Sequence, residues 1–125
     1  IKSKITADYI IGDGDSVCEI PDKIVRNPYI HIADQNSNDL TKAFNYAKDN
    51  FPISPIIIFA ANGLREDHSI ASFGLLFEFS KKHDKVAMIS DYGIFNSCRS
   101  GKSIFNVIKG QQISLFSLKQ TTQIN

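Results

Sequence analysis

The chain has 125 residues, of which 42% are hydrophobic, so it can bury one core and leaves little room for a second complete domain. Fourteen basic and thirteen acidic residues give a formal net charge of +1, which argues against a dedicated nucleic-acid or membrane-surface binder. The longest apolar run, residues 56–61, is too short to cross a bilayer, and no signal-peptide pattern opens the sequence. Because Cys18 and Cys98 form no CxxC pair, we expect neither a zinc site nor a redox motif, and a cytoplasmic setting.

The first polar loop follows a short apolar run at residues 9–11 and reads Gly12-Asp13-Gly14-Asp15-Ser16. Because side chains alternate along an extended chain, Asp13 and Asp15 can point to the same place. Two converging carboxylates repel each other unless a divalent cation, an arginine or a shared proton lies between them. We interpret this loop as the floor of a phosphate and magnesium site, and a solvated turn is the alternative.

The second polar loop, residues 34–39, follows a strand predicted at residues 29–33 and precedes a helix. Apolar residues at helical spacing predict this helix over residues 40–51, and its buried face would consist of Leu40, Ala43, Phe44, Ala47 and Phe51. Asn38 or Ser37 is suited to cap it, which places Asp39 in its first turn. Asp39 taken alone can be explained as a charge that the helix dipole favours.

The third polar loop, residues 62–68, follows the apolar run at residues 56–61 and carries Arg65, Asp67 and His68. An uninterrupted apolar run is typical of a central strand that is covered on both faces. A second helix is predicted from Ser69, with Ile70, Phe73, Leu76 and Phe77 on its buried face, and another strand is predicted at residues 85–90. Arg65 and Asp67 taken alone can be explained as a surface ion pair, and His68 as a residue that braces the loop.

Strands and helices therefore alternate, which predicts the α/β class with a three-layer, Rossmann-like parallel sheet. Right-handed crossovers would then place the three polar loops along one edge of the sheet, where ligands bind in such folds. Short β-like segments at residues 93–95, 103–108 and 112–118 follow without a helix between them. We therefore predict an α/β domain over residues 1–92 and the beginning of an all-β sandwich domain over residues 93–125. Because both ends look cut, we expect further chain, including an N-terminal strand, outside this sequence.

Several carboxylates and one arginine at a single edge need a compensating charge. A magnesium ion bound to a polyphosphate supplies this charge balance. The metal would be coordinated by the carboxylates, and Arg65 would donate two hydrogen bonds to phosphate oxygens. Reactions of this kind depend mainly on positioning and charge neutralisation, so they do not require a Ser/His/Asp triad.

The three loops together resemble the thiamine pyrophosphokinase family. That family carries Gly-Asp-Phe-Asp-Ser, then Asp-Gln-Asp-x-Thr-Asp running into a helix with Lys-Ala, then Gly-Gly-Arg-x-Asp-His. The corresponding segments here are residues 12–16, residues 34–39 with Lys42-Ala43, and residues 63–68. The resemblance covers about residues 8–118, because residues 110–115 also look like a Gly-x-x-(Val/Ile)-Ser-Leu strand of the family.

The resemblance implies a homodimer that moves a pyrophosphoryl group from ATP to the hydroxyethyl oxygen of thiamine and releases AMP. It implies that residues 1–92 form the ATP- and Mg²⁺-binding catalytic domain, and that the β-sandwich domain contributes to thiamine binding across the subunit interface. The implied catalytic residues are Asp13, Asp15, Asp39, Arg65 and Asp67, of which the first three would also hold Mg²⁺ or stand near the attacking hydroxyl. The implied nucleotide- or phosphate-binding residues are Ser16, Gln35, Asn38 and His68.

Four loop positions depart from the family pattern: Gly14 replaces an aromatic residue, Asn36 a carboxylate, Asn38 a threonine and Leu64 a glycine. The charged set is intact, and we expect this stretch of chain alone to be inactive or poorly active. Two alternatives stay open. The first is a haloacid-dehalogenase-type phosphatase with Asp13 as nucleophile and Asp15 as acid and base. The second is a non-catalytic nucleotide-binding or dimerisation domain.

Overall fold

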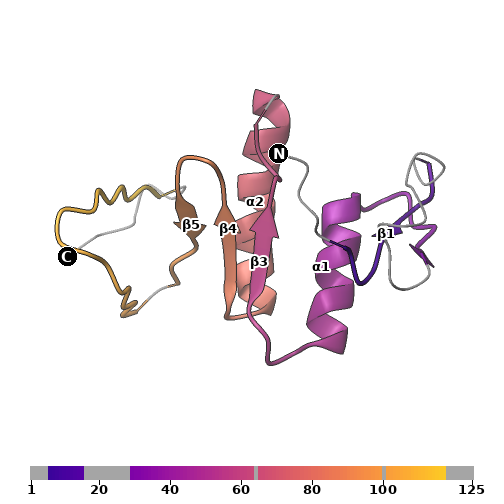
Figure 1. Cartoon of the computed structure of the whole chain (residues 1–125), viewed down its shortest axis with the longest axis horizontal. Helices are drawn as coiled ribbons and strands as arrows, with labels where there is room; N and C mark the ends of the chain where they lie inside the picture. Colours follow the sequence, from indigo (N-terminus) through magenta and orange to yellow (C-terminus); the bar gives the residue numbers. More distant parts are fainter. Residues whose placement is uncertain (1–5, 16–28, 64, 100, 118–125) are drawn as a thin grey trace.

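The fold belongs to the α/β class, as predicted, and forms two small sheets. The computed structural model describes residues 6–15, 29–63, 65–99 and 101–117. Their elements, labelled in Figure 1 where there is room, are β1 (Ile11–Gly12), β2 (Ile30–His31), α1 (Asp39–Asn50), β3 (Ile56–Phe59), α2 (Glu66–Lys82), β4 (Val86–Ile89) and β5 (Ile94–Asn96). One sheet pairs β1 and β2 in parallel, and the other has the order β3-β4-β5. No helix in these ranges combines the length and apolar character that crossing a membrane requires.

Local capping explains where α1 begins. The Asn38 side chain accepts a hydrogen bond from the Thr41 backbone N–H at 2.8 Å, which confirms it as the N-cap. Asp39 therefore lies in the first turn, where the helix dipole favours a carboxylate. Pro52 follows closely after the helix and prevents its continuation. Phe51, which was expected on the buried face, lies just past the last helical residue and is exposed.

The helix α2 begins at Glu66, three residues earlier than Ser69, where the sequence predicted its start. Ile70 was expected on its buried face but is 71% exposed. The buried positions of α2 are Ser72, Leu76, Phe79 and Ser80. Leu76 and Phe79 are therefore the core residues of α2, and Phe73 and Leu75 pack against them.

One hydrophobic core joins α1, α2, β3 and β4. Its members are Phe44, Ile58, Leu76, Phe79, Val86 and Met88. The rings of Phe44 and Phe79 stack with centroids 3.9 Å apart and an interplanar angle of 4°. This stack holds α1 against α2. Because Phe44 also belongs to the core that covers the larger sheet, it fixes α1 relative to that sheet.

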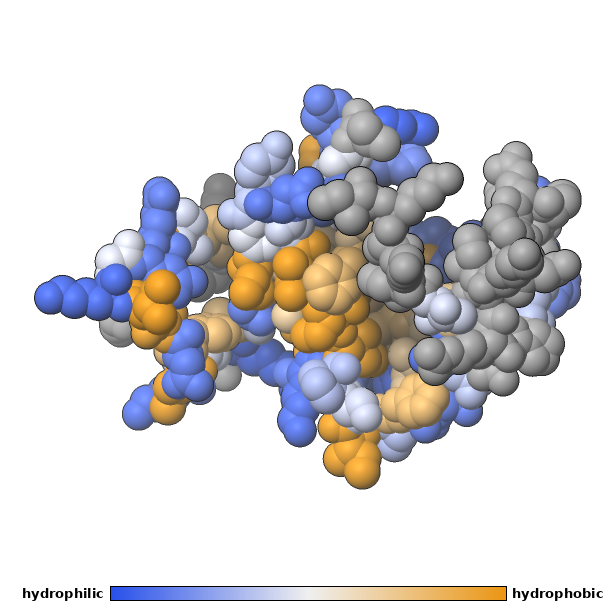
Figure 2. Space-filling view, viewed as in Figure 1, coloured by the Kyte–Doolittle hydropathy of each residue, from blue (hydrophilic) through white to orange (hydrophobic). Residues whose placement is uncertain are grey.

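Within the described residues the larger sheet is covered on one face only, so the expected three-layer, Rossmann-like arrangement stays a prediction. Ile58 faces the core, whereas Ile57 and Phe59 point the other way and are 44% and 66% exposed. The strand register places Phe59 beside Ile89 and Ile89 beside Ile94, which is also exposed. Figure 2 shows hydrophobic side chains in the middle of the view, where β3 and β4 lie in Figure 1.

The segment after β4 begins as a strand and continues without one. β5 pairs antiparallel with β4, so this strand extends the β3-β4 sheet. The β-like segments expected at residues 103–108 and 112–118 contain no strand in the part that the structure describes. Phe116 contacts Phe77 of α2, with ring centroids 6.4 Å apart. The division into two domains at residue 92 stays a prediction.

Candidate functional site

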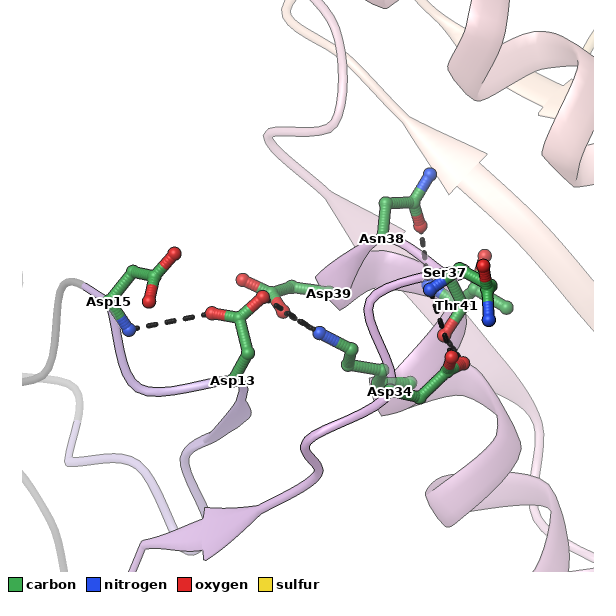
Figure 3. A network of polar contacts seen from close by, with 9 residues as sticks. Asp13, Asp15, Asp34, Ser37, Asn38, Asp39 and Thr41 are labelled. Carbon is green, nitrogen blue, oxygen red and sulfur yellow. Dashed lines mark hydrogen bonds and ion pairs between the residues drawn. The ribbon is translucent and has the colours of Figure 1, made fainter.

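The first two polar loops meet because β1 and β2 pair in parallel. The backbone N–H of Ile30 donates to the carbonyl of Ile10, and that of Ile32 donates to the carbonyl of Gly12, each at 2.8 Å. Parallel strands end at the same edge of a sheet, so the loop after β1 and the start of α1 lie together there. Figure 3 shows the carboxylates of Asp13 and Asp39 turned toward each other at this edge.

A buried lysine lies between these two carboxylates. Lys42 is 2% exposed, and its ammonium donates to Asp13 Oδ2 at 2.9 Å and to Asp39 Oδ1 at 3.1 Å. The expected partner of Asp13 was Asp15, but Asp15 reaches it only through its backbone N–H, which lies 3.4 Å from Asp13 Oδ1. The convergence of carboxylates is therefore real, but Asp39 supplies the second one and a lysine supplies the counter-charge.

The ion pair changes the acidity of both partners. The hydrogen bond from Lys42 holds the pKa of Asp13 below its ordinary value, and the backbone N–H of Asp15 lowers it further. The hydrogen bond to Asp13 raises the pKa of Lys42 against the opposing effect of its burial. Both groups are therefore charged at neutral pH.

Acid should weaken this site in a way that depends on Lys42. The folded pKa of Asp13 lies below its unfolded value of 3.8, so its stabilising effect is fully present above that value and disappears as the pH falls through the folded pKa. We expect urea unfolding to show that wild type loses more stability between about pH 5 and pH 2 than Lys42→Met does. Identical pH dependence in the two proteins would contradict the ion pair.

Gly12 allows Asp39 to approach the backbone of β1. A Cβ atom added at Gly12 would meet Oδ1, Cγ and Oδ2 of Asp39 at 3.3, 3.4 and 3.4 Å, which is tighter than most real contacts of such an atom. Gly14 has a φ of +99°, a backbone conformation that residues with a side chain rarely adopt. The two glycines of the first loop therefore have different roles, close approach at one and backbone geometry at the other.

The second loop is held by its own polar side chains. Asp34 accepts hydrogen bonds from the hydroxyl of Ser37 at 2.5 Å and from the backbone N–H of Asn36 at 2.9 Å, and these contacts lower its pKa. Asn38 serves as the cap of α1, and Gln35 lies exposed in the turn. Ser16 lies outside the described residues. The nucleotide-binding roles of these residues stay predictions.

The third loop forms a local ion pair. Arg65 donates from Nε to Asp67 Oδ1 at 3.0 Å and from a terminal nitrogen to Oδ2 at 2.5 Å, and both side chains are 64% exposed. The guanidinium lowers the pKa of Asp67. His68 lies exposed in the first turn of α2. Within the described residues no hydrogen bond or ion pair joins this loop to Asp13 or Asp39, so its membership of the site stays a prediction.

Comparison with known families identifies the family of this chain. Residues 1–88 match the family described as "Thiamin pyrophosphokinase, catalytic domain". The match covers well over half of the chain and contains all three polar loops. The chain belongs to the thiamin pyrophosphokinase family. A search of curated proteins found no match.

The thiamin pyrophosphokinase catalytic domain in this chain offers two carboxylates to a divalent cation. Among the described residues, no three His, Cys, Asp or Glu side chains lie close enough together to hold a metal ion. Metal binding by Asp13, Asp15 and Asp39 together therefore has no support from the structure and stays a prediction. Asp13 and Asp39 nevertheless fit Mg²⁺, which is usually bound by one or two carboxylates together with phosphate oxygens and water. The Asp39 side chain is 61% exposed, so a ligand can reach this carboxylate.

Two further residues of this domain were not among the predicted site residues. In the sequence, Lys42 was noted only as part of a Lys-Ala motif. Its position three residues after Asp39 on a helix nevertheless predicts an ion pair between the two side chains. The Tyr29 hydroxyl is buried and has no hydrogen-bond partner within the described residues. Its burial raises its pKa, and the nearby carboxylates of Asp13 and Asp39 raise it further. A buried donor beside the carboxylates fits a site that receives a ligand oxygen.

Gly12→Ala should disturb catalysis by this domain more than its folding. The new methyl group would push the Asp39 carboxylate outward and lengthen its 3.1 Å contact with Lys42. We expect turnover to fall about tenfold, because small displacements of positioning groups have large kinetic effects. Gly93→Ala is the matched control, since its methyl group would meet nothing within 4 Å. Equal activities of both variants would contradict the close approach.

Proposed function

We propose that the protein is an ATP-dependent thiamine pyrophosphokinase that produces thiamine diphosphate and AMP. The observation that carries the proposal is the convergence of Asp13 and Asp39 on one ammonium, at a strand edge inside the matched catalytic domain. Phosphoryl transfer depends on positioning and charge stabilisation, which such an edge supplies. The phosphatase alternative has no comparable support.

The proposed reaction begins with the hydroxyethyl oxygen of thiamine, which attacks the β-phosphorus of ATP. The bond between that phosphorus and the bridging oxygen of the α-phosphate breaks, and AMP leaves with the bond electrons. The hydroxyl proton passes to a carboxylate, for which we propose Asp15, because Lys42 already engages Asp13 and Asp39. Asp13 and Asp39 would hold Mg²⁺, which supplies charge neutralisation on the phosphates when bound.

In this proposal Arg65 would bind the polyphosphate of ATP. Its guanidinium is exposed and already oriented by two contacts to Asp67, so it can offer remaining N–H groups to phosphate oxygens. Gln35, Asn38, His68 and Ser16 would contact the nucleotide. The proposal also includes a cytoplasmic homodimer, with a β-sandwich domain that completes the thiamine site.

The direct test incubates the full-length protein, not this stretch of chain alone, with ATP, Mg²⁺ and thiamine and resolves nucleotides and thiamine esters by chromatography. Equal amounts of AMP and thiamine diphosphate are expected. Release of inorganic phosphate from small phosphoesters would instead favour the phosphatase, and nucleotide binding without any product would favour a non-catalytic domain. A parallel incubation of Asp13→Asn identifies activity from a contaminating enzyme.

A further inference from the structure

Lys42 is placed where a lysine is unfavourable unless it has a specific partner. Its side chain is 1% exposed, and burying a cation is costly unless the charge is paired. It also lies near the start of α1, where the helix dipole disfavours positive charge. Neither burial nor helix stability therefore accounts for a cation at this position.

The contacts of Lys42 supply the missing reason. Its ammonium contacts both Asp13, which follows β1, and Asp39, the first residue of α1. It therefore links two elements that are distant in sequence and adjacent only in the folded protein. The buried ammonium has little access to solvent, whereas the Asp39 side chain is 61% exposed. Asp39 is therefore open to solvent, whereas Asp13 is 21% exposed and the lysine contacts both carboxylates from the buried side.

We infer that Lys42 is a positioning residue that acts as the built-in counter-ion of the Asp13–Asp39 pair. It keeps the two carboxylates together before any ligand arrives and leaves the trio with a single net negative charge. A divalent cation alone is then held weakly, and the site favours a cation that arrives with a polyphosphate. This inference rests on the proposed function for its catalytic consequence, but its metal-binding consequence can be measured independently.

The test measures Mn²⁺ alone, by electron paramagnetic resonance of the free ion, in wild type, Lys42→Met, Lys42→Gln and Lys42→Arg. One unit charge about 5 Å from a divalent cation changes its affinity about tenfold even at the dielectric constant of water. We therefore expect Lys42→Met and Lys42→Gln to bind Mn²⁺ about tenfold more tightly than wild type, and Lys42→Arg to resemble wild type. Adding Asp39→Asn to Lys42→Met should remove the gain, which locates the ion at this pair.

The matched control is Lys48→Met, because Lys48 lies on the same helix and pairs with its neighbour Asp49. Its Mn²⁺ affinity should equal that of wild type. Unchanged or weaker Mn²⁺ binding in folded Lys42→Met and Lys42→Gln would overturn the counter-ion role. Circular dichroism establishes folding, and Lys42→Gln serves if Lys42→Met fails to fold.

Measurement of turnover distinguishes a positioning role of Lys42 from a purely structural role. We expect Lys42→Gln to lower kcat about tenfold or more with little change in KM for ATP, and Lys42→Arg to recover most of the loss. Wild-type kcat in folded Lys42→Gln would overturn the positioning role. If the full-length wild-type protein forms no AMP at all, the proposed function fails, while the Mn²⁺ measurements still decide the counter-ion role.

Discussion

Asp13→Asn should lower turnover about 100-fold or more and leave a folded protein. Asparagine keeps the shape of aspartate and still offers an oxygen to Lys42, whose ammonium lies 2.9 Å from Asp13 Oδ2. It removes the negative charge that would face a cation and a polyphosphate, and charge stabilisation is the largest contribution in most reactions of this type. The loss should therefore appear in kcat and not in the folded fraction.

The matched control for this variant is Asp49→Asn, which removes an exposed acid from the other end of α1. Steady-state production of AMP and a thermal melt should be measured for both variants. Turnover of Asp13→Asn close to that of wild type would contradict a catalytic role for this residue. An equal loss in Asp49→Asn would show that overall charge, and not the site, governs the rate.

Phe79→Ala should have the largest effect on stability, about 3–5 kcal/mol in the free energy of unfolding. Phe79 is 1% exposed and stacks on Phe44, so alanine leaves a cavity between α1 and α2 that the neighbouring side chains fill only in part. Small domains are stable by about 5–15 kcal/mol in total, so this loss is a large share. Urea unfolding followed by circular dichroism measures it directly.

Phe59→Ala provides the comparison, because Phe59 is an aromatic residue that is 66% exposed on the uncovered face of the sheet. Its replacement should change the free energy of unfolding by about 1 kcal/mol or less, the span of strand propensities. A loss as large as that of Phe79→Ala would show that this face is covered in solution. It would also support the three-layer arrangement that the sequence predicted.

Local features of the fold were predictable because they depend on neighbouring residues. The cap at Asn38 needs only the N–H groups of the following turn, and the start of α1 was therefore predicted to within one residue, with Asn38 as one of two possible caps. The alternation of strands and helices was predicted for the same reason. The buried face of α2 was predicted only in part. Leu76 is buried and Phe73 packs against the core as expected, but Ile70 is exposed while Phe79 is buried, and these two differ in environment and not in hydrophobicity.

The sequence by itself determined the α/β class, the family and the polar loops that follow the strands, because each of these features depends on residues that lie close together along the chain. Only the tertiary structure decided that Asp13 meets Asp39 in place of Asp15, and that the charge between them belongs to Lys42, 29 residues from Asp13. Spacing along the chain limits which side chains can share a direction. Which of them touch depends on how separate elements pack, and the pairing of β1 with β2 and the contact of α1 with β1 set that packing here.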